Sequence, residues 1–398
     1  MTKKIAVVGG GIIGSATAYE LKKADPTLDV QLFEKESSIG SHQTGHNSGV
    51  VHAGLYYTPG SNKAKFCRRG VNKLKSFCAD HGLRYEELGK LVVAQGSEET
   101  ELLKDVFERS TANEVPGVRW LQTDEITELE PNVQGDAALL SPGTAIIDFS
   151  AVAKKLAEQA EQAGATISLG KEVLDITTHA TGVLVSTNRD EHQFDHVVIC
   201  AGLQSDRIAR RAGDAKYPII VPFFGSYYLL NEHDSGLVSR AIYPVPDPKY
   251  PFLGVHITPR LDGRMMIGPN AYLSFAREKY GRMGTSVGDL SSMATHLGFW
   301  KMAMRNMGQA AKLLPEVLGP GGLLSGAKEL VPRIEGTGVT SLTRGIRAQA
   351  VSSQGELEDD FVLHSEDRLT ILRNAPSPGA TSALALGEEL ARLALGKE

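Results

Sequence analysis

Several features that would mark other classes of protein are scarce in this sequence. It has three cysteines in 398 residues, Cys67, Cys78 and Cys200, whose spacing fits neither a CxxC redox centre nor a metal-ligand motif. This scarcity excludes a disulfide-rich secreted protein and favours a reducing compartment. No apolar run reaches about 18 residues, so no transmembrane helix is predicted. The first predicted strand begins at Lys4, which leaves no room for a signal or transit peptide, and we expect a cytoplasmic protein.

A strong excess of either charge is also missing. The chain has 42 Lys and Arg against 47 Asp and Glu, a net charge of −5, which gives no reason to expect nucleic-acid binding. A small anionic substrate would therefore need a local cluster of cations. The composition, 41% hydrophobic and 22% charged, is that of a soluble globular protein, and the length predicts about two domains.

The first 35 residues contain a nucleotide-binding pattern. An apolar strand leads into the glycine-rich run at residues 9–14, a helical stretch follows, and a second strand ends at Glu34. Gly9 permits a tight turn, Gly11 lets the backbone approach a pyrophosphate, and Gly14 lets the helix pack closely against the strand. The phosphates would lie at the helix N-terminus, and the Glu34 carboxylate would accept hydrogen bonds from a ribose.

The order of the predicted elements indicates two interleaved domains. Strands and helices alternate at residues 1–84, 148–215 and 345–398, which we assign to the nucleotide-binding domain. Residues 85–147 and 216–344 would form the substrate-binding domain. The expected fold is α/β, with a Rossmann-like FAD-binding domain interleaved with an α+β substrate domain on a mostly antiparallel sheet. The pattern also predicts helices at residues 98–109, 151–163 and 383–395, and a mostly helical segment at 289–318.

Two later segments favour FAD over NAD. Residues 197–202 read as a buried strand that ends in a small pair, Ala201 and Gly202, which would let the backbone approach the cofactor. Residues 374–382 lead into a helix, and a helix N-terminus would stabilise the negative charge at the N1–C2=O end of a reduced flavin. No second GxGxxG motif is present, so a separate NADPH domain is not expected and the electron donor should bind directly at the flavin.

Motifs in both halves of the chain resemble those of a known family. They look like the signature of L-2-hydroxyglutarate oxidases and dehydrogenases, which belong to the D-amino-acid-oxidase-like flavoprotein superfamily. The resemblance lies in residues 42–57, 59–61, 243–248, 251–256, 268–271, 345–349 and 374–382. It implies an FAD-dependent oxidation of L-2-hydroxyglutarate to 2-oxoglutarate. One motif departs from the pattern, since Phe224 and Ser226 stand where family members resemble Pro-Phe-Arg-Gly-Glu-Tyr, so the finer substrate preference is not carried over.

The pattern and the resemblance together give a set of residues expected to contact FAD. These are Gly9, Gly11, Ile13, Gly14, Glu34, Lys35, Thr44, His46, Asn47, Ser48, Gly49, Val173, Ala201, Gly202, Gly379, Ala380, Thr381 and Ser382. His46 and Asn47 lack a nearby carboxylate pattern, and no metal site is predicted.

Oxidation of a 2-hydroxy acid needs a base for the hydroxyl proton, a cation for the carboxylate and a dry pocket over the flavin. His256 and His52 are the candidate bases, because the ordinary pKa of histidine lies near neutrality. Arg347 is the candidate carboxylate clamp, since a guanidinium can donate two parallel hydrogen bonds. Tyr243 would hold the hydroxyl or the carboxylate.

Further residues are expected to assist. Lys63 and Arg68 would help with a distal carboxylate, and Asn270 would orient the flavin or the substrate.

Other interpretations of the sequence stay open. The chain would also fit an amino-acid or amine oxidase, in which the histidines are structural, or a non-catalytic flavin-binding protein that binds a partner. The stretch from Leu297 to Leu314 mixes apolar and basic residues at helical spacing, so it would either cover the substrate domain or lie on a membrane surface. The electron acceptor would be oxygen, a quinone or another electron-transport carrier.

Overall fold

A computed structural model describes residues 2–246, 254–281, 284–306 and 319–397. Parts of two motifs, at residues 247–248 and 251–253, and the last part of the expected helical segment, at 307–318, lie outside the described residues. Within the described ranges, no helix combines the length and the apolar composition needed to cross a bilayer.

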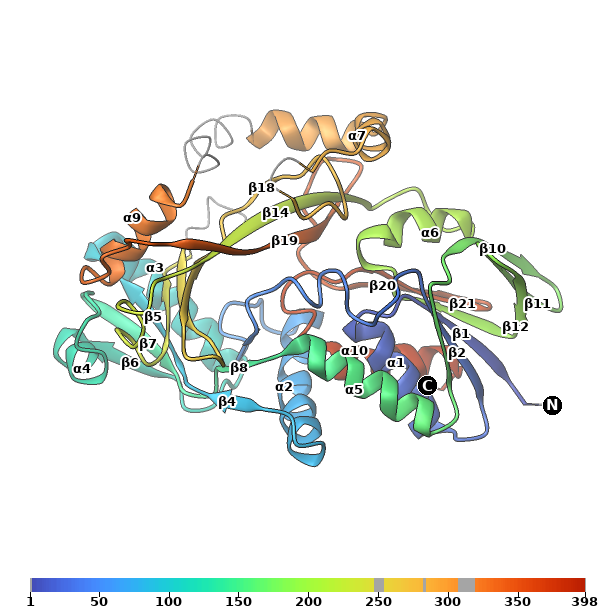
Figure 1. The fold of residues 1–398 in the computed structure, drawn as a ribbon, viewed down its shortest axis with the longest axis horizontal. Coiled ribbons are helices and arrows are strands. Elements are labelled where there is room, and N and C mark those ends of the chain that lie inside the picture. Colours follow the sequence, from blue (N-terminus) through green and yellow to red (C-terminus); the bar gives the residue numbers. More distant parts are fainter. Residues whose placement is uncertain (1, 247–253, 282–283, 307–318, 398) are drawn as a thin grey trace.

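Segments far apart in the sequence form a six-stranded sheet, here called the parallel sheet (Figure 1). Its strands, in spatial order, are β20 (Val362–Glu366), β21 (Leu369–Asn374), β13 (His196–Ile199), β1 (Lys4–Val8), β2 (Asp29–Glu34) and β9 (Thr166–Leu169). All neighbours pair in parallel except β20 and β21. This Rossmann-like order, with β1 in the interior, places the glycine-rich run where the first strand ends.

Both faces of the parallel sheet are covered. Ile5 and Val7 of β1 face a core formed with α1 (Ile12–Ala24), α5 (Phe149–Gln162) and α10 (Ala383–Ala394). The alternate residues Ala6 and Val8 face a second core beneath a three-stranded antiparallel sheet. That sheet consists of β10 (Val173–His179), β11 (Gly182–Thr187) and β12 (Glu191–Phe194). Burial on both faces explains why β1 is apolar throughout its length after Lys4.

The second sheet has nine strands and is here called the large sheet. Its strands, in order, are β18 (Tyr272–Leu273), β14 (Ile219–Leu229), β17 (Met265–Gly268), β16 (His256–Pro259), β15 (Ala241–Pro244), β5 (Lys90–Ala94), β7 (Ala137–Ser141) and β6 (Arg119–Gln122), and β19 (Thr340–Val351) also pairs with β14. Only β5 and β15 pair in parallel, so the predicted mostly antiparallel substrate sheet is confirmed.

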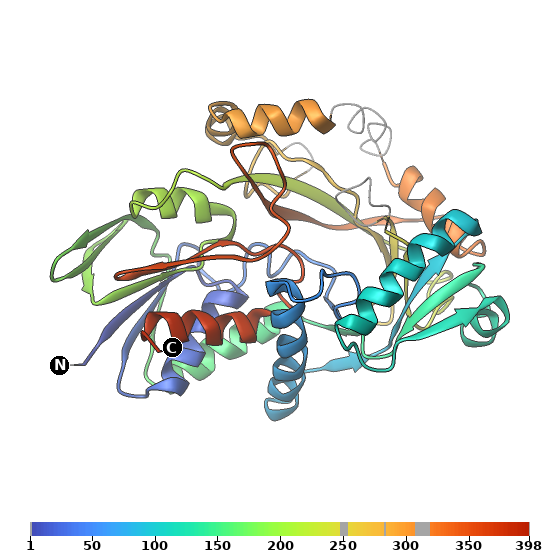
Figure 2. The same cartoon turned by 180° about the vertical axis from the view of Figure 1, so that it is seen from behind.

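Short elements complete the second half of the molecule. A small sheet of β3 (Val50–Val51), β8 (Ala145–Ile147) and β4 (Tyr85–Glu87) lies between the two larger ones, next to α2 (Asn62–Asp80) (Figure 2). The helices near the large sheet are α3 (Gly96–Ala112), α4 (Thr123–Leu129), α7 (Val287–Ala294) and α9 (Gly321–Leu330). Residues 297–306 are also helical.

The long strands β14 and β19 form an antiparallel ribbon that reaches from the parallel sheet across the large sheet (Figure 1). Phe223 lies opposite Arg347 in this ribbon, and Phe224 lies opposite Ile346. The predicted start of the last segment of the FAD-binding domain, residue 345, falls inside β19. This strand belongs to the large sheet, and the next strand of the parallel sheet is β20.

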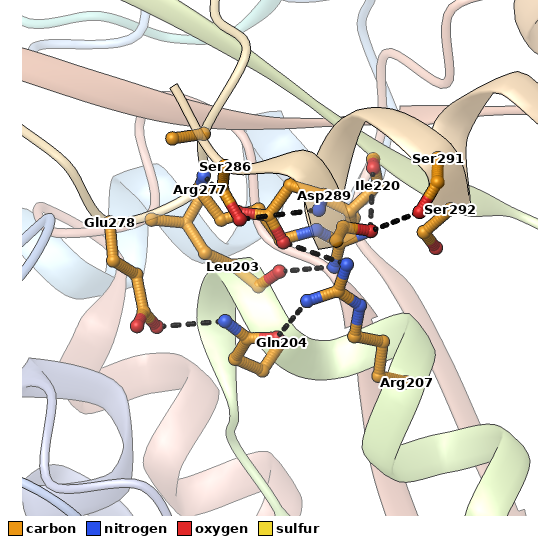
Figure 3. A network of polar contacts seen from close by, with 12 residues as sticks. Leu203, Gln204, Arg207, Ile220, Arg277, Glu278, Ser286, Asp289, Ser291 and Ser292 are labelled. Carbon is orange, nitrogen blue, oxygen red and sulfur yellow. Dashed lines mark hydrogen bonds and ion pairs between the residues drawn. The ribbon is translucent and has the colours of Figure 1, made fainter. Parts of the chain in front are cut away.

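A buried ion pair fixes the start of this ribbon (Figure 3). Arg277 is 2% exposed and donates to Asp206 on α6 (Ser205–Arg211), to the Leu203 carbonyl (2.6 Å) and to the Ile220 carbonyl (3.0 Å). Burial favours the neutral acid, but Arg277 holds the pKa of Asp206 below its usual value. The network therefore connects the segment before α7 to the first residues of β14.

Candidate active site

Two adjoining cavities lie at the carboxyl ends of β1 and β13, with volumes of about 280 Å³ and about 140 Å³. They share Gly11, Gln43, Thr44, Cys200 and Gly202 in their walls, so they form one elongated cleft. The first cavity continues between the parallel sheet and the large sheet. An elongated cleft at this edge of a parallel sheet is where a doubly wound fold binds a dinucleotide.

The glycine-rich run has the geometry that close backbone approach requires. Gly9 has φ +109°, and a Cβ there would lie 2.4 Å from the Cys200 carbonyl oxygen. A Cβ on Gly14 would lie 1.9 Å from the Gly9 carbonyl oxygen, so only glycine lets α1 pack this closely. A Cβ on Gly11 would meet nothing nearer than Thr44 Oγ1 at 3.5 Å, because this position opens into both cavities. The open space at Gly11 fits a pyrophosphate.

The start of α1 is suited to an anion. No acidic residue lies in its first turn, and Gly11 at the N-cap offers no side chain to the helix N–H groups. The Ile12 N–H donates to Thr44 Oγ1 at 3.0 Å. The positive end of the helix dipole is thus available to the negative charge of a phosphate.

The second cavity has polar walls that fit the ribose end of FAD. Glu34 accepts hydrogen bonds from the N–H groups of Gly10 (2.7 Å) and Glu36 (2.9 Å), and each carboxylate oxygen keeps a lone pair for a ribose hydroxyl. Lys35 lies on the same wall and forms ion pairs with Glu36 and with Glu278 (3.0 Å). Val173 and Ala201 complete this part of the wall.

Glu36, His42 and Glu278 lie close enough together to hold a metal ion. The Lys35 ammonium contacts all three, at 3.0 Å from His42 Nε2, and already supplies the positive charge of that place.

The expected flavin residues divide into three groups by position. On the wall of the first cavity lie Gly11, Ile13, Thr44, His46, Asn47, Ser48, Gly202, Gly379, Ala380 and Thr381. Glu34, Lys35, Val173, Ala201 and Gly9 line the second cavity, and Gly14, Gly49 and Ser382 line neither. Residues 375–381 line the cavity directly before α10, so the segment expected to face the flavin lies on the cavity wall.

Two of these side chains have structural partners. The amide of Asn47 donates to the Gln43 and Thr44 carbonyls and accepts from the Gly49 N–H (2.8 Å), so this side chain shapes its own loop. The His46 ring stacks on Tyr280 with centroids 3.9 Å apart, and its Nδ1 lies 2.9 Å from Thr343 Oγ1.

His256 is oriented as a base. It begins β16, is 6% exposed and lines the first cavity. Its Nδ1 lies 3.0 Å from the Gly254 carbonyl oxygen, which can only accept a hydrogen bond. The proton of the neutral ring therefore sits on Nδ1, and Nε2 carries a free lone pair. Burial, followed by the charge of Lys90, keeps the pKa of His256 well below its usual value, so the ring is neutral.

His52 lies on the same cavity wall but has weaker polar contacts. Its Nε2 is 3.5 Å from Ser377 Oγ, and its backbone N–H donates to Thr381 Oγ1 at 3.1 Å. Burial lowers the pKa of His52 to about 3, with Lys90 and Arg347 adding to the effect. Both predicted bases are thus brought to one cavity.

Arg347 reaches the first cavity from β19. Burial lowers the pKa of its guanidinium, and Tyr227 and Asp359 oppose this shift. A guanidinium still keeps its charge at neutral pH. The cavity therefore contains a cation beside two neutral histidines, which suits a carboxylate next to a hydroxyl group.

The other predicted substrate residues differ in position. The Tyr243 ring packs against His256 with centroids 3.7 Å apart, and Asn270 accepts the Ser226 N–H at 2.8 Å; both line the cavity. Lys63 and Arg68 lie outside the cavity wall, and the Lys63 ammonium pairs with Asp359 at 2.6 Å.

Sequence reasoning missed three residues of this region. Gln43 accepts the Ala348 N–H at 3.0 Å and lines both cavities. Tyr227 lines the first cavity, and burial raises the pKa of its hydroxyl to about 12. Lys90 lies buried behind Tyr243. A signal for Lys90 was present, since it is the single charge at the start of the apolar run Lys90–Ala94.

Comparison with known proteins gives consistent matches. A family model described as FAD dependent oxidoreductase matches residues 4–393. The L-2-hydroxyglutarate dehydrogenase of Indibacter alkaliphilus is 37% identical over 396 residues, covering 99% of this chain and 99% of that protein. The protein of that name from Escherichia coli is 38% identical and covers 96% of this chain and 91% of its own. The mitochondrial one from Homo sapiens is also 38% identical, with 97% and 87% covered.

Solved structures show the same architecture. L-α-glycerophosphate oxidase from Mycoplasma pneumoniae, with FAD bound, superposes with a TM-score of 0.81 at 26% identity, covering 99% of this chain and 95% of that one. Glycine oxidase from Geobacillus kaustophilus has a TM-score of 0.74 at 23% identity, covering 100% and 96%, which shows a shared fold. The predicted fold class, an FAD-binding domain interleaved with a substrate domain, is confirmed.

Proposed function

The chain belongs to the family of FAD-dependent oxidoreductases, and on this premise we propose that it oxidises L-2-hydroxyglutarate to 2-oxoglutarate. One observation carries the proposal: the unprotonated Nε2 of His256 and the Arg347 guanidinium share one cavity with residues 375–381, which precede α10. A 2-hydroxy acid needs this combination of a neutral base, a fixed cation and a flavin.

Different side chains act at C1 and at C2 of the substrate. Arg347 binds the C1 carboxylate with two N–H groups and so fixes the orientation of the adjacent carbon. His256 accepts the hydroxyl proton at Nε2, while the proton on Nδ1 stays there and keeps its hydrogen bond to the Gly254 carbonyl oxygen. FAD, when bound by the residues of the cleft, would supply the acceptor for the hydride that leaves C2. Loss of one proton and one hydride converts the alcohol carbon to the carbonyl of 2-oxoglutarate.

Neighbouring residues support this arrangement. The Tyr243 ring against His256 limits ring rotation and excludes water from that side. Asn270 accepts a hydrogen bond from the Ser226 N–H of β14, and Ser226 is one of the two positions at which this chain differs from the family motif. His52 is proposed to contact the substrate hydroxyl from the opposite loop.

Anaerobic titration of the purified yellow protein tests the proposal. L-2-hydroxyglutarate should bleach the flavin absorbance band, whereas D-2-hydroxyglutarate should not. Reduction by an amino acid or an amine, with no response to either hydroxy acid, would instead identify an amine oxidase. A protein that binds FAD and responds to none of these compounds would be a non-catalytic flavoprotein.

The proposed electron acceptors are oxygen and a quinone or another electron-transport carrier. Mixing the photoreduced protein with air-saturated buffer, or anaerobically with a soluble short-chain quinone, separates the two. Rapid return of the flavin band with quinone but slow return with oxygen defines a dehydrogenase, and the reverse result defines an oxidase.

We further propose that the protein works in the cytoplasm and touches the membrane surface through the apolar side chains near α7. Val287 is 82% exposed, Leu297 72%, Met304 65% and Trp300 51%. Val287 begins α7 and the other three lie in the helical residues 297–306; α7 is labelled at the top of Figure 1. Exposed apolar side chains next to Lys and Arg can insert into an anionic bilayer surface.

Sedimentation with anionic vesicles tests this contact. A Leu297→Ser, Met304→Ser double variant should lose binding, whereas the control Leu174→Ser, in which an exposed leucine on β10 is changed, should keep it. Equal sedimentation of all three proteins would rule the contact out.

A further inference from the structure

A lysine is buried in the interior of the large sheet, directly behind the first cavity. Lys90 begins β5, between β7 and β15, and is 1% exposed. Its ammonium lies 4.7 Å from the ring centroid of Tyr56 and 4.7 Å from that of Tyr243. Aromatic faces attract a cation, but they supply only part of the stabilisation that water would give.

Lys90 lacks the usual compensation of a buried charge. Among the described residues, no carboxylate forms an ion pair or hydrogen bond with its ammonium, whereas Lys63, the other buried cation near the cavity, is paired with Asp359. The hydroxyl of Tyr56, against which the ammonium packs, is also buried and has no hydrogen-bond partner in the described structure. A buried charge is normally paired, so this place has an excess of positive charge.

The charge of Lys90 reaches the cavity. Tyr243 has one side of its ring toward Lys90, packs on His256 and lines the cavity. After burial, Lys90 is the strongest charge acting on both His52 and His256. Lys90 itself does not form part of the cavity wall, so it acts through space and through Tyr243.

We propose that Lys90 is a positioning residue that determines specificity, because its buried charge favours a hydroxy acid with a second carboxylate over one with a single carboxylate. The inference rests on the proposed oxidation of a 2-hydroxy acid at this site. Arg347 balances the C1 carboxylate, which leaves a second negative charge of the substrate to be balanced. Lys90 balances it, and the substrate in turn supplies the counter-charge that none of the described residues provides.

The charge state of Lys90 gives the inference a pH signature. Burial lowers the pKa of the Lys90 ammonium to about 7, so the charge is lost from the free protein as the pH rises above this value. The other ionisable groups near Lys90 do not change their charge in the same pH range. The pKa values of His52 and His256 are lowered, and Arg347 stays cationic. The pKa values of four further groups are raised, those of Cys67, Tyr56, Tyr57 and Tyr243. Lys63 keeps its ion pair with the exposed Asp359.

Two unreactive ligands test the inference. Glutarate and pentanoate have the same number of carbons and lack the hydroxyl group, but only glutarate has a second carboxylate. Their dissociation constants are measured from the flavin spectrum of the FAD-loaded parent, of Lys90→Met and of the matched control Lys154→Met, which changes an exposed lysine on α5. Lys90→Met should weaken glutarate binding by on the order of tenfold or more, and pentanoate binding much less. Lys154→Met should change neither.

The preference of the parent for glutarate should also decline between pH 7 and pH 9, and this decline should be absent in Lys90→Met. An equal loss for both ligands in Lys90→Met would make the residue merely structural, and unchanged constants would give it no part in binding. If Lys90→Met does not retain FAD, the pH dependence of the parent protein is the remaining test. A preference of the parent for glutarate that is constant with pH overturns the inference. Failure of L-2-hydroxyglutarate to reduce the parent flavin is a separate result, which rejects the proposed function itself.

Discussion

Replacing Arg347 with alanine should separate substrate binding from flavin binding. The guanidinium reaches the cavity from β19, where Arg347 is partly buried, so its removal would leave the C1 carboxylate in the cavity without its cation. Loss of one partner of a desolvated charge pair costs about 2–5 kcal/mol, which corresponds to roughly 30-fold to several-thousand-fold. Arg347→Lys should recover only part of this loss, because an ammonium replaces two parallel N–H donors with a single point charge.

The assay is anaerobic stopped-flow reduction of the flavin over a range of L-2-hydroxyglutarate concentrations. Arg344→Ala is the matched control, since Arg344 lies on the same strand but stacks over Phe224 and is not on the cavity wall. The Arg347 variants should keep their FAD and their thermal stability while the limiting rate or the apparent affinity falls. Unchanged reduction in Arg347→Ala would refute the assignment of Arg347 as the carboxylate anchor.

Three further outcomes follow from the geometry. Gly11→Val should fold but purify without FAD, as the absorbance spectrum will show, because the added side chain would occupy the space open to both cavities. His256→Asn should lower the rate of flavin reduction by roughly 10²–10⁴-fold at unchanged FAD content, and a variant that reduces at the parent rate would assign the proton to another group. The free energy of unfolding should fall as the pH decreases from about 6.5 to 4, because burial lowers the pKa of His196 to about 4 and the unfolded chain binds the proton first. Urea unfolding at pH 7 and pH 5 should show a smaller difference for His196→Gln than for the parent.

The local elements could be predicted because their signals lie within short windows of sequence. The helices expected at 98–109, 151–163 and 383–395 correspond to α3, α5 and α10, and the first strand and the glycine-rich turn correspond to β1 and the start of α1. The arrangement of glycines carries its own geometric requirement, so the nucleotide end of the cleft could be inferred before the fold was known.

The rest depends on pairings between distant residues. Nothing near Phe223 in the sequence indicates that it lies opposite Arg347 in the ribbon, yet this pairing delivers the cation to the cavity. Lys63 was expected to bind a distal carboxylate, but the structure pairs its ammonium with Asp359, almost 300 positions later. A lysine at the start of an apolar strand is usually a strand end that meets solvent, and only the neighbouring strands show that Lys90 is enclosed.

The interleaving of the sheets also determines when this protein can fold during synthesis. In the parallel sheet β1 pairs with β2 and with β13, and β13 pairs in turn with β21, which the ribosome adds long after β1. Gly387 of α10 packs so closely on Ala16 of α1 that a Cβ would lie 2.7 Å from the Ala16 backbone. The packing of α1 is therefore incomplete until α10 has been synthesised. The nascent chain must therefore hold an unfinished sheet until β21 and α10 have been synthesised, a state in which chaperones commonly act. A chain that stops before β21 would lack both a strand of the parallel sheet and residues 375–381 of the cavity wall, so its flavin site would be incomplete.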